Sequence, residues 1–296
     1  MMVGIATRNR DSWCSSRIIK ALEARGVRVH SFSLSQVVAR VGFKGEAPVL
    51  EAKGIDLSKL GALLVRPIGP GSLDEIIFRV DLLHRLEALG VPVVNKPSAI
   101  ERAVDKYYAL TILERAGLKV PKTVVTERPA EAFKAFSQLG GDVVVKPVFG
   151  SRGLGVTRAS DQEAAGRVFR LLAYNHFVLY EQEFIWHGGR DIRCFVIDGR
   201  VVASMYRVAG EGWKTNVSRG GIPIPFKPSS LVEQTAVRAA EALGCEIAGV
   251  DLMETKDGSL LVHEVNSQPG FRGLQTSSGI DIAGLIAEYL IRKAKR

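Results

Sequence analysis

Three oxygen-bearing side chains fall within two neighbouring apolar segments late in the chain. Asp251 lies in the run 248–252, and Glu264 and Asn266 lie two residues apart in the run 260–266. Because side chains two apart on a strand share a face, and a Lys-Asp-Gly turn between the runs predicts a hairpin, the three can converge. Carboxylate and amide oxygens, together with nucleotide phosphates, are ligands that Mg²⁺ prefers. The spacing predicts a magnesium site; the alternative, a solvated hairpin face, fits the apolar flanks less well.

Basic side chains occupy similar positions on other predicted strands. Arg193 shares a strand face with Asp191, Arg207 lies on the next strand of the same hairpin, and Lys146 ends the apolar run 143–145. Cations at such places can neutralise phosphate oxygens. A surface cation is the commoner role for each residue taken alone. Their positions in or beside apolar strands favour phosphate binding.

A glycine-rich segment, 150–155, follows the strand that Lys146 ends, and its backbone N–H groups can approach phosphates. It is neither a Walker loop nor a dinucleotide fingerprint. The five histidines have no metal-ligand spacing, and we interpret His263 as an ordinary strand residue. The chain also lacks the Gly-x-Ser-x-Gly motif of a nucleophilic serine. Triad chemistry therefore has no support.

The elements that must position these residues differ along the chain. Strand-like and helical segments alternate over the first third, which predicts an open, largely parallel α/β sheet. From Lys96-Pro97 onward the pattern changes to one helical stretch, 99–116, followed by antiparallel hairpins, which is typical of an α+β domain. In the first third, Ser72 and Glu75 form a capping box that predicts the start of a helix.

Composition bounds the class of protein. The chain has 296 residues, 46% hydrophobic and 24% charged, which excludes a disordered chain and a disulfide-stapled mini-protein. The net charge of +9 fits either a solvated surface or attraction of anionic partners. Three scattered cysteines predict a reducing, cytoplasmic location. We find no signal-peptide pattern and no apolar run long enough to span a bilayer.

Short strings across residues 97–296 resemble the ATP-grasp superfamily and, within it, the RimK-like glutamate ligases. They occur in the family's order, and their combination is far more specific than any one of them. The strings are Asp105-Lys106, Val143-Val144-Val145-Lys146-Pro147, Gly150-Ser151-Arg152-Gly153-Leu154-Gly155, Glu181-Gln182-Glu183-Phe184-Ile185, Asp191-Ile192-Arg193-Cys194, Asn216 with Ser218-Arg219-Gly220-Gly221, Ala248-Gly249-Val250-Asp251, Glu264-Val265-Asn266 and Gly279-Ile280-Asp281-Ile282-Ala283-Gly284.

The resemblance implies a domain organisation. Residues 1–96 look like the small α/β domain that precedes such modules, and residues 97–296 like the ATP-grasp domain, with a smaller lid subdomain at about 122–187. The segment 66–75 looks most like the branch that adds glutamate to tetrahydromethanopterin. The segment 183–191 is about one residue shorter than in the relatives that modify a ribosomal protein.

The resemblance also implies a role for each site residue. Metal binding by Asp251, Glu264 and Asn266 would involve two Mg²⁺ ions, or Mn²⁺, with Glu264 bridging. Arg219 would stabilise the acyl phosphate and the tetrahedral intermediate, with help from Asn216. The nucleotide would contact a further set: Lys106 and Lys146 at the phosphates, Gly153 and Gly155 in the closing loop, Glu183, Phe184 and Ile185 at adenine, Asp191 at the ribose, and Arg193 and Arg207 towards the phosphate and substrate end.

The implied activity is a carboxylate–amine ligase that joins L-glutamate to an acceptor carboxylate and releases ADP and phosphate. Tetrahydromethanopterin is the first acceptor to expect; a ribosomal-protein C-terminus, a deazaflavin coenzyme and an amino-carrier protein are alternatives. We expect a homo-oligomer with no membrane or nucleic-acid partner. A non-catalytic nucleotide- or nucleic-acid-binding module is the alternative from another class, and the complete set of Asp251, Glu264 and Asn266 disfavours it.

Overall fold

The computed structural model describes residues 1–43, 45–150, 153–210 and 212–295, and only the backbone of Arg219. The predicted parallel sheet is present in the N-terminal part, with strand order β2-β1-β6-β7 and every pairing parallel. The capping box at Ser72 and Glu75 is confirmed at the start of the long helix α2. The elements are β1 (Met2–Ala6), α1 (Trp13–Glu23), β2 (Arg28–Phe32), β6 (Ala62–Val65), α2 (Leu73–Ala88) and β7 (Val93–Val94).

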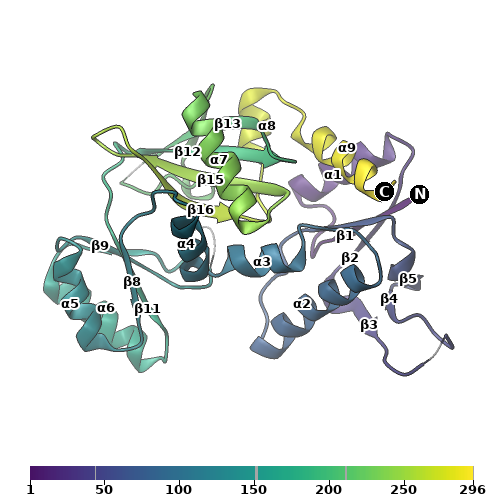
Figure 1. Ribbon diagram of the computed structural model, residues 1–296, viewed down its shortest axis with the longest axis horizontal. Helices are drawn as coiled ribbons and strands as arrows, with labels where there is room; N and C mark the ends of the chain where they lie inside the picture. The colour runs from purple at the N-terminus through teal and green to yellow at the C-terminus, as the bar shows by residue number, and fades with distance from the viewer. Residues whose placement is uncertain (44, 151–152, 211, 296) are drawn as a thin grey trace.

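A second small sheet lies beside this one, and the sequence pattern did not reveal it. Its antiparallel strands are β3 (Val37–Ala39), β4 (Leu50–Ala52) and β5 (Ile55–Asp56), flanked by the short 3₁₀ turns η1 (Leu34–Gln36) and η2 (Leu57–Lys59). Strands of two or three residues are too short to show a period of two. Figure 1 shows this sheet projecting at the lower right.

The lid sheet is an antiparallel layer of four strands in the order β10-β9-β11-β8. Its strands and helices are β8 (Thr123–Thr126), α5 (Pro129–Gln138), β9 (Val143–Lys146), β10 (Thr157–Ala159), α6 (Gln162–Tyr174) and β11 (Leu179–Glu183). The two helices lie side by side over one face of the sheet (Figure 1), where Phe136 and Phe169 pack with Val143 and Val145. The opposite face of the sheet carries Lys146.

The central sheet is the largest layer and has the antiparallel order β14-β13-β12-β15-β16. Asp198-Gly199, a dipeptide typical of hairpin turns, joins β12 to β13, with both residues at positive φ. Its elements are β12 (Arg190–Ile197), β13 (Arg200–Val208), η3 (Val217–Arg219), β14 (Ile222–Pro225), α7 (Ser230–Leu243), β15 (Ile247–Glu254), β16 (Leu260–Asn266) and α8 (Arg272–Ser278). Ile192, Cys194 and Val196 share a core with α7, so the alternate residues Asp191 and Arg193 face the other way.

Two helix boundaries differ from the sequence interpretation. The single helix expected over 99–116 is two helices, α3 (Pro97–Val104) and α4 (Lys106–Arg115). Asp105 breaks the stretch because its backbone is extended and its carboxylate accepts a hydrogen bond from Tyr108 N at 2.9 Å, which caps α4. The spacing of Ser230 and Glu233 predicts a capping box that begins at Ser230, but the N-cap of α7 is Ser229, one residue earlier.

The N-terminal sheet and the central sheet are held together by a shared core and one buried amide. The C-terminal helix α9 (Ile282–Ala294) packs on α1 in a core that also includes Phe195 and Phe271, and Figure 1 shows both chain ends in this region. Asn95 donates to the carbonyls of Ile247 and Ser267 at 2.7 and 2.6 Å. Its Oδ1 also accepts from the backbone N–H of Ile247. All hydrogen-bonding groups of this amide are satisfied across the junction, which fixes the end of β16.

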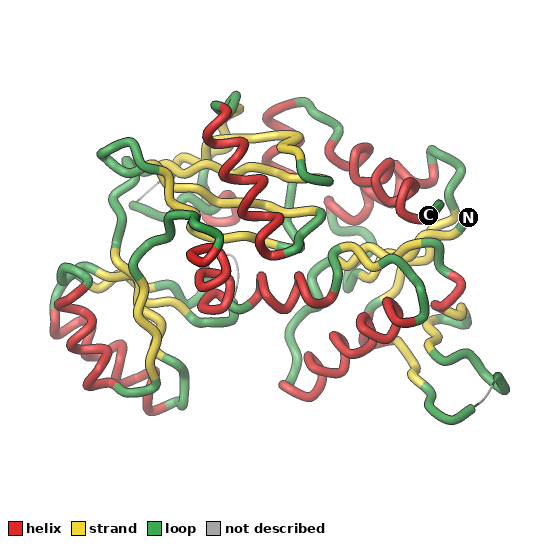
Figure 2. The backbone as a smooth tube through the Cα atoms, viewed as in Figure 1, coloured by secondary structure: helices red, strands yellow, loops and turns green. Residues whose placement is uncertain are grey.

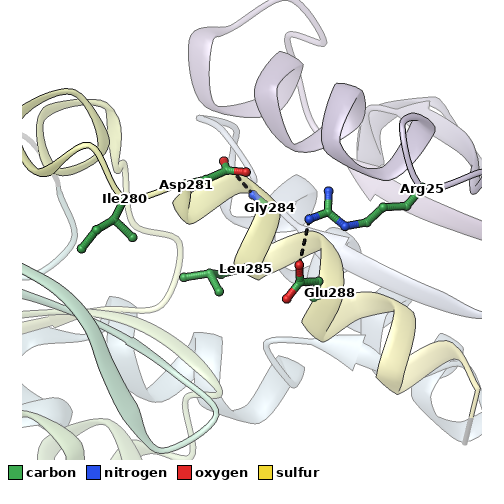
Figure 3. Close-up of a pocket in the computed structure, with 6 residues that line it drawn as sticks. All are labelled: Arg25, Ile280, Asp281, Gly284, Leu285 and Glu288. Carbon is green, nitrogen blue, oxygen red and sulfur yellow. Dashed lines mark hydrogen bonds and ion pairs between the residues drawn. The ribbon is translucent and has the colours of Figure 1, made fainter.

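A surface hollow beside α9 contains contacts that stabilise this junction. Arg25 donates to Glu288 Oε1 at 2.8 Å, and Asp281 caps α9 by accepting from Gly284 N at 3.0 Å (Figure 3). These groups satisfy one another; Asp281 and Gly284 belong to the string 279–284 of the resemblance, and none of the groups is among the predicted site residues. Figure 2 shows the central and lid sheets as separate strand layers. Within the described residues, no helix is both long and apolar enough to cross a membrane.

Candidate active site

The register of β15 and β16 brings the three oxygen donors onto one face of the central sheet. Asp251 pairs directly with Glu264, and Gly249 pairs with Asn266. A β-bulge follows Asp251, so that His263 has no partner of its own on β15. The shared face that the spacing predicted is confirmed.

Asp251 is 2% exposed and lies between two guanidinium groups. Arg193 Nη2 donates to Asp251 Oδ2 at 2.9 Å, and Arg207 Nη2 lies 3.1 Å from the same oxygen. Burial raises the pKa of this carboxyl, and Arg193 and Arg207 oppose that rise. Because both cations contact the carboxylate directly, we take Asp251 as ionised.

Gly249 makes room for this arrangement. A Cβ at this position would overlap the guanidinium of Arg193 and lie 2.9 Å from the ring of Pro269. The absence of a side chain therefore allows Arg193 to lie flat over β15 and reach Asp251.

Asp191 is buried and its carboxylate is fully engaged. Arg207 binds it through two parallel hydrogen bonds of 2.7 and 2.5 Å, and Thr215 Oγ1 donates to it at 2.7 Å. Burial opposes the charge of Arg207, but Asp251 and Asp191 outweigh it and raise the pKa of the guanidinium. The predicted ribose contact of Asp191 stays a prediction, and in this form of the protein the residue orients Arg207.

Lys146 crosses from the lid sheet towards the central sheet. Its Nζ donates to Gln182 Oε1 at 2.6 Å and lies 3.4 Å from His263 Nε2. Burial lowers the pKa of Lys146 to about 7, Glu264 acts to raise it and Lys106 to lower it further. Burial lowers the pKa of His263 well below its ordinary value, and the charge of Lys146 lowers it further, so this ring is neutral. A buried amine with one neutral acceptor is suited to receive a phosphate oxygen.

Lys106 begins α4 and points at the start of the glycine-rich loop. Its Nζ donates to Gly150 O at 2.8 Å and to Val148 O at 3.3 Å. Burial lowers its pKa, and the charges of Glu264 and Asp105 act in the other direction. Lys106, Lys146 and Glu264 thus share one electrostatic environment, as the phosphate role requires.

The predicted adenine edge lies where β11 leaves the lid sheet. The N–H groups of Glu183 and Phe184 are already bound, to Lys122 O at 3.0 Å and Asp142 O at 2.9 Å. Within the described part of the chain, the N–H of Ile185 has no acceptor, so this group is the one available to a base. The Phe184 ring itself packs edge-on against Trp213 at 5.6 Å.

The remaining predicted residues lie in the loops that border the site. Gly153 and Gly155 both have positive φ, while Ser151 and Arg152 of the same segment lie outside the described residues. Asn216 precedes η3 and is half-buried. The side chain of Arg219 lies outside the described part of the structure, so its catalytic role stays a prediction.

The donor set fits a magnesium ion. Asp251, Glu264 and Asn266 present two carboxylates and one amide oxygen on one face of the sheet, and such hard oxygen donors suit Mg²⁺. In this structure Asp251 Oδ1 is in contact with Arg193 Nε, so binding of an ion there would displace that guanidinium contact. Among the described residues no group of three His, Cys, Asp or Glu side chains has metal-binding geometry.

Sequence reasoning missed several contact residues of this site. His263 reaches Lys146 because of the bulge, which no spacing rule reveals. Gln182 is one residue from the predicted adenine edge and could have been found as the polar residue facing Lys146 on the neighbouring strand. Thr215 and Trp213 lie in a loop, where periodicity carries no information.

An antiparallel lid sheet that carries Lys146 and an antiparallel central sheet that carries the paired carboxylates Asp251 and Glu264 are typical of the ATP-grasp class. Residues 103–290 match the RimK-like ATP-grasp domain, and residues 1–100 match the RimK PreATP-grasp domain. The chain belongs to the RimK-like ATP-grasp family and is an ATP-dependent ligase.

Named relatives match over their full length. The chain is 36% identical to the tetrahydromethanopterin:α-L-glutamate ligase of Methanosarcina acetivorans, over 97% of this chain and 98% of the relative. It is 38% identical to the protein of the same description from Methanocaldococcus jannaschii, over 100% of both chains. A probable α-L-glutamate ligase of Aliivibrio fischeri is 35% identical over 99% of this chain and 96% of its own.

Solved structures share the whole fold. The ATP-grasp ligase PsnB, complexed with a minimal precursor, Mg and ADP, superposes with a TM-score of 0.76 at 23% identity, covering 100% of this chain and 98% of the other. A RimK-domain ATP-grasp protein from Sphaerobacter thermophilus gives 0.72 at 23% identity, covering 98% and 100%. At this identity the likeness concerns the fold alone.

Proposed function

We propose that this protein joins L-glutamate to an acceptor carboxylate at the expense of ATP, releasing ADP and phosphate. The observation that carries the proposal is the direct pairing of Asp251 with Glu264 across β15 and β16, together with the effect of Glu264, whose charge acts to raise the pKa of both Lys146 and Lys106. Full-length similarity to ligases named for glutamate supports the amine substrate.

The proposed reaction has two steps. An oxygen of the acceptor carboxylate attacks the γ-phosphorus, the bond from that phosphorus to the β,γ-bridging oxygen breaks, and ADP leaves. The amine of glutamate then attacks the carbonyl carbon of the acyl phosphate. The C–O bond to phosphate breaks, phosphate leaves and the amine loses a proton, giving the amide.

The first step brings two anions together, and this chain supplies the compensating charge. Lys106 and Lys146 would bind phosphate oxygens, and Arg193 and Arg207 lie at the central-sheet end of the site. Bound Mg²⁺, held by Asp251, Glu264 and Asn266, would neutralise phosphate charge and orient the γ-phosphate. Two ions, and the use of Mn²⁺, are part of the proposal.

Arg219, oriented with the help of Asn216, would stabilise the oxyanion of the tetrahedral intermediate in the second step. A guanidinium offers two parallel hydrogen bonds to such an oxygen. The bend that carries this residue is tight, because Gly220 has φ of 91° and a Cβ on Gly221 would overlap the carbonyl of Thr215. Only glycine fits that approach.

We propose tetrahydromethanopterin as the acceptor, since the two relatives named for it align over almost the whole chain. A cytoplasmic location accords with the free state of Cys14, Cys194 and Cys245.

A mass-shift screen tests the proposal. The protein is incubated with ATP, Mg²⁺, L-glutamate and one acceptor at a time: tetrahydromethanopterin, a ribosomal-protein C-terminal peptide, a deazaflavin coenzyme or an amino-carrier peptide. We expect the pterin to gain the mass of a glutamyl residue with one ADP released per addition. A gain on another acceptor alone would overturn the pterin assignment, and ADP release without any adduct would overturn glutamate ligation.

A further inference from the structure

Arg66 is a buried cation without a counter-ion, and it lies outside the ATP site. The residue directly follows β6 and is 7% exposed. Its Nη1 donates to the carbonyl of Pro269 at 3.0 Å, and its Nε is buried without an acceptor. Among the described residues, no carboxylate forms an ion pair with it. Burial lowers the pKa of Arg66, yet a guanidinium stays charged, so the free protein holds an uncompensated charge.

The position of Arg66 is one where open α/β sheets bind ligands. The chain leaves β1 towards β2 on one side, and β6 lies on the other side of β1, so the strand order reverses between β1 and β6. At such a reversal a crevice opens at the carboxyl ends of the strands. Here the crevice is bordered by Thr7, Arg8, Leu34, Arg66 and Pro67, which close on one another and leave no space for a water molecule.

Two further features make the crevice electropositive. Arg8 is exposed and lies against Gly69, where a Cβ would overlap its side chain. Helix α1 follows β1, and its N-terminus has neither an acidic residue in the first turn nor a side-chain cap. Thr7, which borders the crevice together with Arg66, has its Oγ1 3.1 Å from Ser15 Oγ in the first turn of this helix. This contact places the helix end beside the crevice, and Cys14 of the same turn is close enough for its charge to act on Arg66.

The crevice adjoins the reaction site. Pro269, which accepts from Arg66, also lies against Gly249 beside Arg193, and Arg193 binds Asp251. Pro269 follows Asn266 by only three residues, a span of at most about 10 Å. A molecule that presents a carboxylate at Asp251 and its metal can therefore reach Arg66 with a second group.

We infer that Arg66, Arg8 and the N-terminus of α1 form an anion subsite that binds a second carboxylate or a phosphate of the acceptor. The identity of the ligand as the acceptor rests on the proposed function, but the presence of an anion subsite does not. Entry of the anion involves a rearrangement of the exposed Arg8 side chain, which forms part of the wall.

Cys14 allows a binding test that needs no ligase activity. Burial raises the pKa of Cys194 and of Cys245 to about 12, so Cys14 is the thiol that reacts with iodoacetamide. With inorganic phosphate as the probe, against chloride at equal ionic strength, we expect at least threefold slower alkylation of Cys14. Protection should be lost in Arg8→Gln and in Arg66→Gln, and kept in Arg10→Gln, whose exposed arginine faces Glu23 instead.

Equal protection in all variants, or none in the wild type, would overturn the subsite. Arg8 is exposed, so the test does not depend on tolerance of a buried substitution. In steady-state kinetics we expect Arg8→Gln to raise the KM of the acceptor about tenfold and to leave the KM values of ATP and glutamate within twofold. A raised KM for glutamate instead would show that the crevice binds the amino acid. Protection by phosphate in a protein that ligates no acceptor would reject the proposed function and keep the subsite.

Discussion

The central sheet and the lid sheet both bury ionisable groups, but they compensate them differently. On the central sheet Asp191 and Asp251 contact Arg207, and Asp251 also contacts Arg193. On the lid sheet Glu181 is fully buried with neither oxygen bonded, and the close acceptor of Lys146 is a neutral amide. Paired charges remain ionised, whereas unpaired buried groups shift towards their neutral forms.

The two sheets therefore have different electrostatic roles. The central sheet keeps a fixed array of charges that can hold a metal and orient phosphates over a wide pH range. On the lid sheet, Lys146 gains its charge, or a partner for it, when an anion binds, whereas Glu181 stays in its neutral form. Each of the following substitutions alters one of these two regions.

The largest effect is expected for the paired charges of the central sheet. Asp251→Asn or Glu264→Gln should reduce ligation by about 10³-fold or more, the several kcal/mol that a metal contributes to charge stabilisation. Turnover measured against Mg²⁺ concentration checks this, with circular dichroism to confirm folding. Asp257→Asn, in the exposed turn between the same strands, is the control. Full activity of both variants at limiting Mg²⁺ would exclude the metal assignment.

A smaller loss is expected at Arg219, on the loop between β13 and β14. Arg219→Lys keeps the charge and removes the forked donor, so kcat should fall by about 10²-fold, as for the loss of one oxyanion donor. The KM for ATP should stay within a factor of about two, since the predicted adenine and ribose contacts lie elsewhere. Normal kcat with weakened ATP binding would make Arg219 a nucleotide ligand instead.

The unpaired carboxyl of Glu181 on the lid sheet predicts that the stability of the protein depends on pH. Burial raises the pKa of Glu181 from 4.5 to about 8. The folded state therefore holds this proton more tightly than the unfolded state, and stability falls as the pH rises from about 4.5 to 8. Glu181→Met, which removes the carboxyl without adding a polar group, should flatten this fall and stabilise the protein at pH 8 by about 1 kcal/mol or more.

Denaturant unfolding at pH 5, 6.5 and 8 measures that effect. Glu163→Gln on α6 is the matched control, because that carboxylate is exposed and pairs with Arg167. If Glu181→Met and the wild type lose stability in parallel as the pH rises, the carboxyl is solvated and the contrast between the sheets is wrong.

The smallest effect concerns the wall of the adenine edge. Arg158 lies 3.6 Å from the centre of the Phe184 ring and forms an ion pair with Asp142 at 2.6 Å. Because this pair is partly exposed, Arg158→Gln should change the KM of ATP by less than about fivefold, within 1 kcal/mol. A change of a hundredfold would mean that Arg158 contacts the nucleotide itself.

The sequence allowed the prediction of features that depend on period and spacing. The strand face shared by Asp251, Glu264 and Asn266 follows from a period of two, and the parallel sheet follows from strand–helix alternation. The bulge at His263 does not, because one inserted residue is invisible to a pattern of alternating faces.

The pairing of charges could not be predicted from the sequence either. Nothing in the order of residues shows that Arg207 binds Asp191 and Asp251 together, since that requires the register of three strands. The three-stranded sheet β3–β5 was missed for a different reason, because its strands are too short for periodicity. The break at Asp105 is not predictable from the sequence because the pattern on both sides of it is helical.

The central claim is that an acceptor carboxylate is activated as an acyl phosphate where the two sheets face each other. The acceptor identified by the mass-shift screen is labelled with ¹⁸O in its carboxylate and converted with ATP, Mg²⁺ and glutamate. We expect the released phosphate to carry one ¹⁸O atom for each glutamyl residue added, because the attacking oxygen leaves with phosphorus. Unlabelled phosphate, formed alongside a normal amount of amide product, would contradict the account.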